Sequence, residues 1–292
     1  MKNIIEHYRQ EVIEDIFKLQ SVQKVWPIWK NLVQKKLTNL NPENIFNLGD
    51  ELRDIMFSTN KGRNQSSQSA GGNAWEFFVC WYLNLCLVGS KSVVVKFKKK
   101  FIPEVVKDAI AVNYSNFTTN TESDLMAITF SDEINLKKEN FNLKKLNSYI
   151  DENLSDISIF NIQCKTNWND NAQIPMLWDI VYQAKGFESD YISVGSNNRK
   201  LSHFKKFRYC FVTVPTQKKP EEMFKNTSVC VKRVQNISGG NYWGMKTKEG
   251  VARSIKELLT RNLDEGNNNG SLRKDLEKSL TDKSYFKYFD IF

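Results

Sequence analysis

Gln163 and Lys165 have the residue types and the spacing of a hydrolytic site. They close the segment Ile157 to Lys165, which reads ISIFNIQCK. Side chains alternate between the two faces of a strand, so Gln163 and Lys165 project from the same face, together with Asn161. An oxygen ligand beside a cation can hold a metal ion and orient a water molecule for attack. The alternative is that Lys165 only marks the point where a core strand emerges into solvent.

Asp124 starts the preceding apolar segment, DLMAITF, at residues 124–130. If the two segments are antiparallel neighbours, the start of one meets the end of the other. Asp124 then lies beside Gln163 and Lys165, and an acid and a base converge. The alternative is that Asp124 is an ordinary turn residue before a strand.

Glu76 is the lone acid in the helical segment GGNAWEFFVCWYLNLCLVG. Burying an unpaired carboxylate costs several kcal/mol, so Glu76 needs a cation, a metal ion or a route to water. A metal ion near Asp124 would meet this need. The alternative is that Glu76 occupies a narrow exposed stripe of the helix.

The elements that must position these residues follow from apolar periodicity. A helical hairpin is predicted at residues 7–37 with a break at Pro27, then a helix at 42–56, a polar loop at 58–72 and a helix at 73–88. Strands are predicted at residues 92–97, 124–130, 157–165 and 208–214, with a helix at 174–185. A strand is predicted at 228–234, a turn at 239–240, and helices at 251–263 and 272–280.

This order of elements predicts a mixed α/β fold, with a central mixed β-sheet flanked by helices and a helical N-terminal region. We expect one domain over residues 1–292. Residues 1–57 form its N-terminal helical region, residues 71–215 its core and residues 216–292 a C-terminal extension. No internal repeat is apparent.

Composition narrows the classes of function. The 292 residues carry a formal net charge of +9, which favours polyanionic partners such as nucleic acid. His7 and His203 are far apart and have no partners at metal-ligand spacing, so zinc hydrolases and histidine-based nucleases are poorly supported. The five cysteines are read as reduced core thiols. The charged N-terminus and the lack of an apolar run of about 18 residues indicate a cytoplasmic protein without a membrane span.

The order of these elements and residues resembles the PD-(D/E)xK nuclease superfamily, and type II restriction endonucleases in particular. The resemblance covers residues 71–215 and predicts a restriction-endonuclease-like core. By this resemblance Asp124 matches the metal-binding acid, Gln163 the D/E position, Lys165 the lysine, and Glu76 an extra acid on the helix before the sheet. Ser123 stands where the motif has proline, and Gln163 brings an oxygen ligand without charge.

The resemblance implies a Mg²⁺-dependent, site-specific endodeoxyribonuclease of a restriction-modification system. Asp124, Glu76, Gln163 and the carbonyl of Cys164 are the expected metal ligands. A water molecule, oriented by the metal or by Lys165, would attack the phosphodiester in line and leave 5′-phosphate and 3′-hydroxyl ends. A homodimer on double-stranded DNA is expected, with a cognate DNA methyltransferase as a functional companion.

Several polar or basic segments are candidates for DNA contact. The segment after Lys165 can read base edges or stack on bases, through Asn167, Trp168, Asn169, Asp170, Asn171 and Gln173. Contacts to phosphates are expected from Ser66, Ser67, Lys98, Lys99 and Lys100. The basic runs at residues 96–100, 198–208 and 218–219 supply further cations. The alternatives are an Asn-rich turn that caps a helix and ordinary solvated charges.

Two other classes of function remain open. A nucleic-acid-binding protein with a nuclease-like fold and no cleavage activity is compatible with the neutral Gln163. A basic helical interaction protein would show no salt-sensitive DNA binding.

Overall fold

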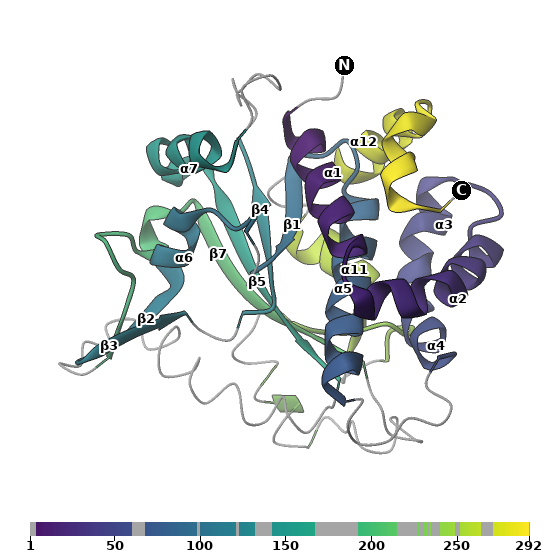
Figure 1. Ribbon diagram of the computed structural model, residues 1–292, viewed down its shortest axis with the longest axis horizontal. Helices are drawn as coiled ribbons and strands as arrows, with labels where there is room; N and C mark the ends of the chain where they lie inside the picture. Colours follow the sequence, from purple (N-terminus) through teal and green to yellow (C-terminus); the bar gives the residue numbers. More distant parts are fainter. Residues whose placement is uncertain are drawn as a thin grey trace.

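A central six-stranded β-sheet organises the molecule, with helices on both of its sides (Figure 1). The computed structural model describes residues 4–59, 68–97, 100–120, 123–131, 142–166, 192–214, 227, 231–232, 234, 240–248, 252–263 and 271–291. The expected α/β class, with a helical N-terminal region, is confirmed.

The N-terminal region consists of α1 (Ile4–Phe17), α2 (Gln20–Lys36), α3 (Pro42–Asn47), the 3-10 turn η1 (Leu48–Asp50) and α4 (Leu52–Phe57). The chain turns between α1 and α2, and Pro27 lies inside α2. The predicted break at Pro27 is therefore wrong. Trp26 and Trp29, which lie on either side of the proline, are both buried in the core. Their packing stabilises the helical conformation of α2 despite the proline.

The helix α5 (Gln68–Cys86) lies between the sheet and the N-terminal helices (Figure 1). It begins before the predicted Asn73 and so includes Gly71 and Gly72. The Trp29 ring stacks on Phe78 with 4.7 Å between centroids. A helix that is apolar on all sides is stable when it is buried on all sides, and this central position accounts for the aromatic sequence of α5.

The six strands of the main sheet follow the order β1-β4-β5-β7-β8-β9. They are β1 (Ser92–Lys96), β4 (Leu125–Thr129), β5 (Ser158–Lys165), β7 (Lys206–Thr213), β8 (Asn241–Trp243) and β9 (Arg253–Ser254). Strand β4 is antiparallel to both β1 and β5, whereas β5, β7, β8 and β9 run parallel to one another. The strands predicted near residues 92–97, 124–130, 157–165 and 208–214 are confirmed.

A smaller sheet and two helices between the main strands were not predicted. The sheet has the order β3-β2-β6 and is built from β2 (Ala111–Tyr114), β3 (Phe117–Asn120) and β6 (Ile192–Val194). The helices α6 (Glu104–Ile110) and α7 (Leu143–Glu152) lie across the strands from α5 (Figure 1). The 3-10 turns η4 (Leu154–Asp156) and η7 (Leu201–His203) lead into β5 and β7.

The C-terminal part contains α11 (Lys256–Leu258), the π-helical turn η8 (Leu259–Leu263), α12 (Ser271–Ser279) and η10 (Lys283–Phe289). The helix predicted at 272–280 is confirmed as α12, whereas the one predicted at 251–263 begins as strand β9. Val231, Lys232 and Val234 are helical, so the strand predicted there is wrong. The helix predicted at 174–185 lies outside the described residues. No helix in the described part of the chain is long and apolar enough to cross a bilayer.

Candidate functional site

Asp124 lies directly beside Gln163. Since β4 and β5 are antiparallel, extending their register by one residue sets these two residues opposite each other. Gln163 Nε2 donates a hydrogen bond to Asp124 Oδ2 at 3.0 Å, and the Cys164 N–H donates to the same oxygen at 2.7 Å. The Asp124 carbonyl accepts a hydrogen bond from the Phe97 N–H at 3.0 Å. Asp124 is thus held in place from both neighbouring strands.

Lys165 ends β5, two residues beyond Gln163 on the same face, opposite Thr213 of β7. The side chain is half-buried. None of the ion pairs between described residues involves Lys165. The end of β5 therefore presents an ammonium group that no described carboxylate neutralises.

Glu76 forms an ion pair with Lys96 at the end of β1. The Lys96 Nζ to Glu76 Oε2 distance is 2.6 Å, and the two side chains are only 9% and 20% exposed. The buried acid does have the cation that its environment requires, and that cation is a lysine. The expectation that Lys96 is part of an exposed run of phosphate-contacting lysines is therefore wrong.

The ion pair and Gln163 occupy opposite faces of the sheet. Lys96 pairs with Leu125, which pairs with Ile162, so these three residues share one face. Glu76 reaches Lys96 from α5, which packs against β1. Gln163 follows Ile162 in the strand and projects from the other face. Glu76 is consequently separated from Gln163 by the sheet itself.

Cys164 lies between these two groups of charges. Burial raises the pKa of its thiol well above the usual value of 9.0; the carboxylates of Asp124 and Glu76 raise the pKa further, and the Lys96 ammonium lowers it. The thiol therefore stays protonated and unreactive at neutral pH. Among the described residues, no group of three or more His, Cys, Asp or Glu side chains converges as a metal site would require. Any metal ion would depend on amide or carbonyl oxygens as well.

Three amide side chains on the Gln163 face have buried polar atoms without a hydrogen-bond partner in the described part of the chain: Gln163 Oε1, both polar atoms of Asn161, and Nδ2 of Asn241. Asn241 shares this face because it pairs with Phe211, which pairs with Gln163. Buried polar groups normally have partners, so this face is suited to an added donor or cation. The alternation along β5 points to Asn161 from the sequence alone, whereas the three-residue strand around Asn241 gives no such signal.

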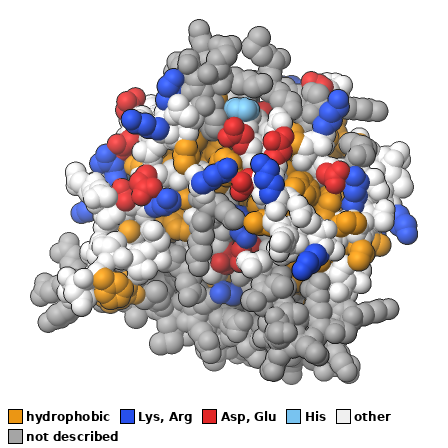
Figure 2. All heavy atoms as spheres, viewed as in Figure 1, with side chains coloured by type: hydrophobic (Ala, Val, Ile, Leu, Met, Phe, Trp, Pro, Cys, Tyr) orange, Lys and Arg blue, Asp and Glu red, His pale blue; other side chains and the backbone are white. Residues whose placement is uncertain are grey.

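Most of the predicted DNA contacts lie outside the described residues. This applies to Asn167, Trp168, Asn169, Asp170, Asn171, Gln173, Ser66, Ser67, Lys98 and Lys99. Lys100 is described, and its side chain is 67% exposed with Nζ 3.3 Å from Asp15 Oδ1. Over the described part of the face in Figure 2, acidic and basic side chains alternate and form no continuous basic patch.

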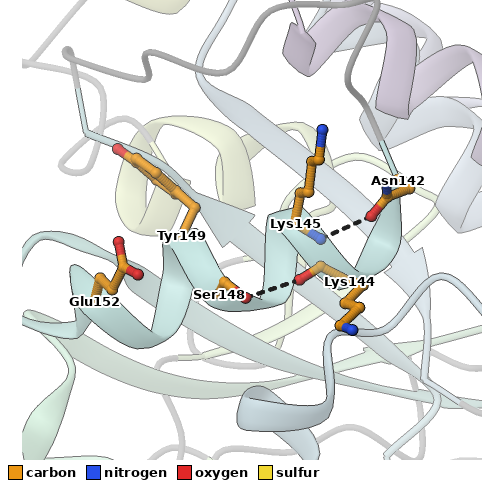
Figure 3. Close-up of a pocket in the computed structure, with 6 residues that line it drawn as sticks. All are labelled: Asn142, Lys144, Lys145, Ser148, Tyr149 and Glu152. Carbon is orange, nitrogen blue, oxygen red and sulfur yellow. Dashed lines mark hydrogen bonds between the residues drawn. The ribbon is translucent and has the colours of Figure 1, made fainter.

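A hollow of about 450 Å³ lies on α7, away from these residues (Figure 3). It is lined by Asn142, Lys144, Lys145, Ser148, Tyr149 and Glu152. The helix leads through η4 into the first residue of β5, whereas Gln163 and Lys165 are at the far end of that strand. The hollow is therefore separated from Asp124 by most of the length of β5 and is not part of the candidate site.

Asp124, Gln163 and Lys165 are thus brought together at the ends of β4 and β5, while Glu76 is engaged with Lys96 across the sheet. Comparison of the sequence with models of known protein families gives no match, and comparison with curated proteins gives none either.

Proposed function

We propose that this protein is a Mg²⁺-dependent endonuclease of the type II restriction kind, which hydrolyses phosphodiester bonds in double-stranded DNA. The observation that carries the proposal is the hydrogen bond from Gln163 to Asp124, next to Lys165, which forms no ion pair with a described carboxylate. The arrangement of α5, β1, β4, β5 and β7 supports it, because it matches the order of elements that the resemblance requires.

The residues present fit a magnesium ion. Gln163 Oε1 is buried without a hydrogen-bond partner among the described residues, and it belongs to the amide that contacts the Asp124 carboxylate. Amide and carboxylate oxygens suit a hard cation. Asp124, Gln163 and the carbonyl of Cys164 would hold the ion, and its charge would stabilise the phosphate as negative charge develops on it. Glu76 would have to leave Lys96 to become a further ligand.

Lys165 would act on the attacking water. Its ammonium would donate a hydrogen bond to the water oxygen and hold it in line with the phosphorus–oxygen bond that breaks. The water oxygen would bond to phosphorus as the bond between phosphorus and the 3′ oxygen breaks. The attacking water would lose a proton to solvent, and the leaving 3′ oxygen would take up a proton from solvent. The products are a 5′-phosphate and a 3′-hydroxyl end, and no covalent bond to the protein forms.

The remaining parts of the proposal concern how DNA is bound. Lys98, Lys99, Lys100, Ser66 and Ser67 would contact phosphates. The polar residues at 167–173 would contact bases. A homodimer would match the two-fold symmetry of a palindromic site, and a DNA methyltransferase of the same specificity would protect the host DNA.

A second candidate is a nucleic-acid-binding protein that does not cleave. Two observations favour it: the ligand beside Asp124 is a neutral amide, and the buried carboxylate of Glu76 is already neutralised by Lys96. Both features lower the negative charge available to a divalent cation.

The experiment that separates the two candidates measures binding and cleavage on the same DNA. Plasmids of diverse sequence are incubated with the purified protein in Mg²⁺ or in EDTA, and binding is followed in parallel at several salt concentrations. Discrete fragments that require Mg²⁺ support the nuclease. Salt-sensitive binding without fragments supports the second candidate, and the absence of both contradicts any role in nucleic-acid binding.

A further inference from the structure

We propose that Lys96 is the fixed cation that neutralises Glu76, so that Asp124 and Gln163 hold a single divalent ion. This inference rests on the proposed nuclease function and deepens it: it makes Lys96 the residue that cancels the charge of Glu76 and sets the metal stoichiometry at one ion per chain.

The first support is the geometry of the ion pair. Lys96 Nζ and Glu76 Oε2 are 2.6 Å apart, and both side chains are largely shielded from solvent. In a shielded pair each charge is compensated mainly by the other, because water no longer screens it. Removing one partner leaves an uncompensated charge, which is strongly unfavourable. Glu76 is therefore held by Lys96 and would not exchange it readily for a second metal ion.

The second support is the position of the pair relative to the oxygens that fit a metal. Lys96 is on the α5 face of the sheet, whereas Gln163 projects from the opposite face. Asp124 is tied to the backbone of Cys164 and to the amide of Gln163. Among described side chains no acidic trio gathers around a common point. Asp124 and Gln163 thus form the proposed metal-binding site, and Glu76 lies on the opposite face of the sheet.

The ion pair determines how much negative charge is available to bind a cation. Glu76 and Lys96 together contribute no net charge, so the carboxylate of Asp124 is the charge that attracts the cation. Since affinity for hard cations follows the charge of the ligands, this site is expected to take one ion. A neutral pair at positions 76 and 96 should serve as well as the native pair, whereas an unpaired Glu76 should attract an additional cation.

The test is a calorimetric titration of the full-length protein with Mn²⁺, which replaces Mg²⁺ in oxygen sites. The decisive variant is the double substitution Glu76→Gln with Lys96→Met, since it removes both charges together. Lys96→Met alone leaves the charge of Glu76 without its compensating cation, and Asp124→Asn removes the charge of the proposed metal ligand. Lys107→Met is the matched control, because Lys107 pairs with Glu104 on the surface. Circular dichroism checks that each variant is folded.

We expect one Mn²⁺ per chain in the native protein, and an affinity within about threefold of native in the double variant. Lys96→Met should bind Mn²⁺ more tightly or take a second ion; if it does not fold, the double variant decides. Asp124→Asn should lose at least about tenfold in affinity. A comparable loss in the double variant would overturn the inference and make Glu76 a ligand. Native affinity in Asp124→Asn would instead contradict the proposed function.

Discussion

The side-chain amide of Gln163 donates to the carboxylate of Asp124 across two antiparallel strands, over 3.0 Å. An acidic residue in place of Gln163 would face the carboxylate of Asp124 at close range. Two carboxylates sharing such a site repel each other unless a proton or a cation lies between them. The amide removes this repulsion, so the site is stable without a metal ion but has less charge with which to bind one.

This relationship predicts the effect of Gln163→Glu. Without divalent ions the variant should be less stable than the native protein, because Asp124 then faces a second carboxylate. Mg²⁺ should restore the stability of the variant: at a Mg²⁺ concentration of about 100 times the dissociation constant, binding adds about 2.7 kcal/mol to the free energy of unfolding. Urea unfolding with and without Mg²⁺ measures this, with the exposed substitution Gln23→Glu as control. An equal response to Mg²⁺ in both variants would contradict the prediction.

A second prediction concerns the buried pair of Glu6 and Arg9, both almost completely inaccessible to solvent. Glu6 also accepts hydrogen bonds from the Gly89 N–H at 2.7 Å and the Tyr288 hydroxyl at 3.0 Å, so it joins α1 to the end of α5 and to the C-terminal segment. Arg9→Met should lower the free energy of unfolding by about 3–5 kcal/mol, because Glu6 is left without its cation.

The matched control is Arg273→Met, since Arg273 pairs with Glu43 at the surface, where the side chains are 60% and 55% exposed. Removing such a pair should change the free energy of unfolding by about 0–1 kcal/mol. Equal decreases in the two variants, measured by urea unfolding, would show that the Glu6 and Arg9 pair has no special part in stability.

A third prediction follows from the buried thiols. Burial raises the pKa of Cys80 from 9.0 to about 12. The unfolded thiol ionises as pH passes 9.0, whereas the folded thiol keeps its proton, so the unfolded state is favoured as pH rises. Stability should be constant below that pH and then fall by up to about 1.4 kcal/mol per pH unit for this thiol. Cys80→Ala should show a shallower decline in urea unfolding measured across this range; an identical decline would refute the assignment.

The pattern of the sequence was sufficient to predict β1, β4, β5 and β7 of the main sheet and the position of Asp124 beside Gln163, but not β8 and β9. Both results depend on local rules: apolar segments of strand length, and the alternation of side chains along them. The same rules did not reveal β2, β3 and β6, which are three or four residues long and partly polar. Such strands form because they pair with each other, and that pairing is not encoded in any one segment.

The ion pair between Glu76 and Lys96 is a feature near the site that the sequence did not predict. The sequence indicated that a buried Glu76 needs a cation, but Lys96 stands in a run of lysines that is typical of a solvated surface. Only the packing of α5 against β1 brings the two side chains within 2.6 Å. Pro27 illustrates the same point, because tertiary packing of the nearby tryptophans outweighs the helix-breaking tendency of proline.

A fourth prediction concerns affinity for DNA. Replacing Lys98, Lys99 and Lys100 by Gln should flatten the dependence of DNA binding on salt, by about 0.9 in the logarithmic slope for each phosphate that a lysine no longer neutralises. Lys278→Gln, on the exposed side of α12, is the control. Binding is measured from about 50 to 200 mM salt. A slope that is unchanged in the triple variant would exclude these lysines from the interface.

The proposed cleavage of DNA at Asp124 and Lys165 is tested most directly by the rate of Mg²⁺-dependent cleavage by Asp124→Asn and Lys165→Met under single-turnover conditions. Asp54→Asn and Lys144→Met serve as controls of matched chemistry away from the site. We expect fragments with 5′-phosphate ends from the native protein and both controls, and rates lower by at least about 100-fold in the two site variants. Cleavage at the native rate by Asp124→Asn, or native cleavage that needs no divalent ion, would contradict this expectation.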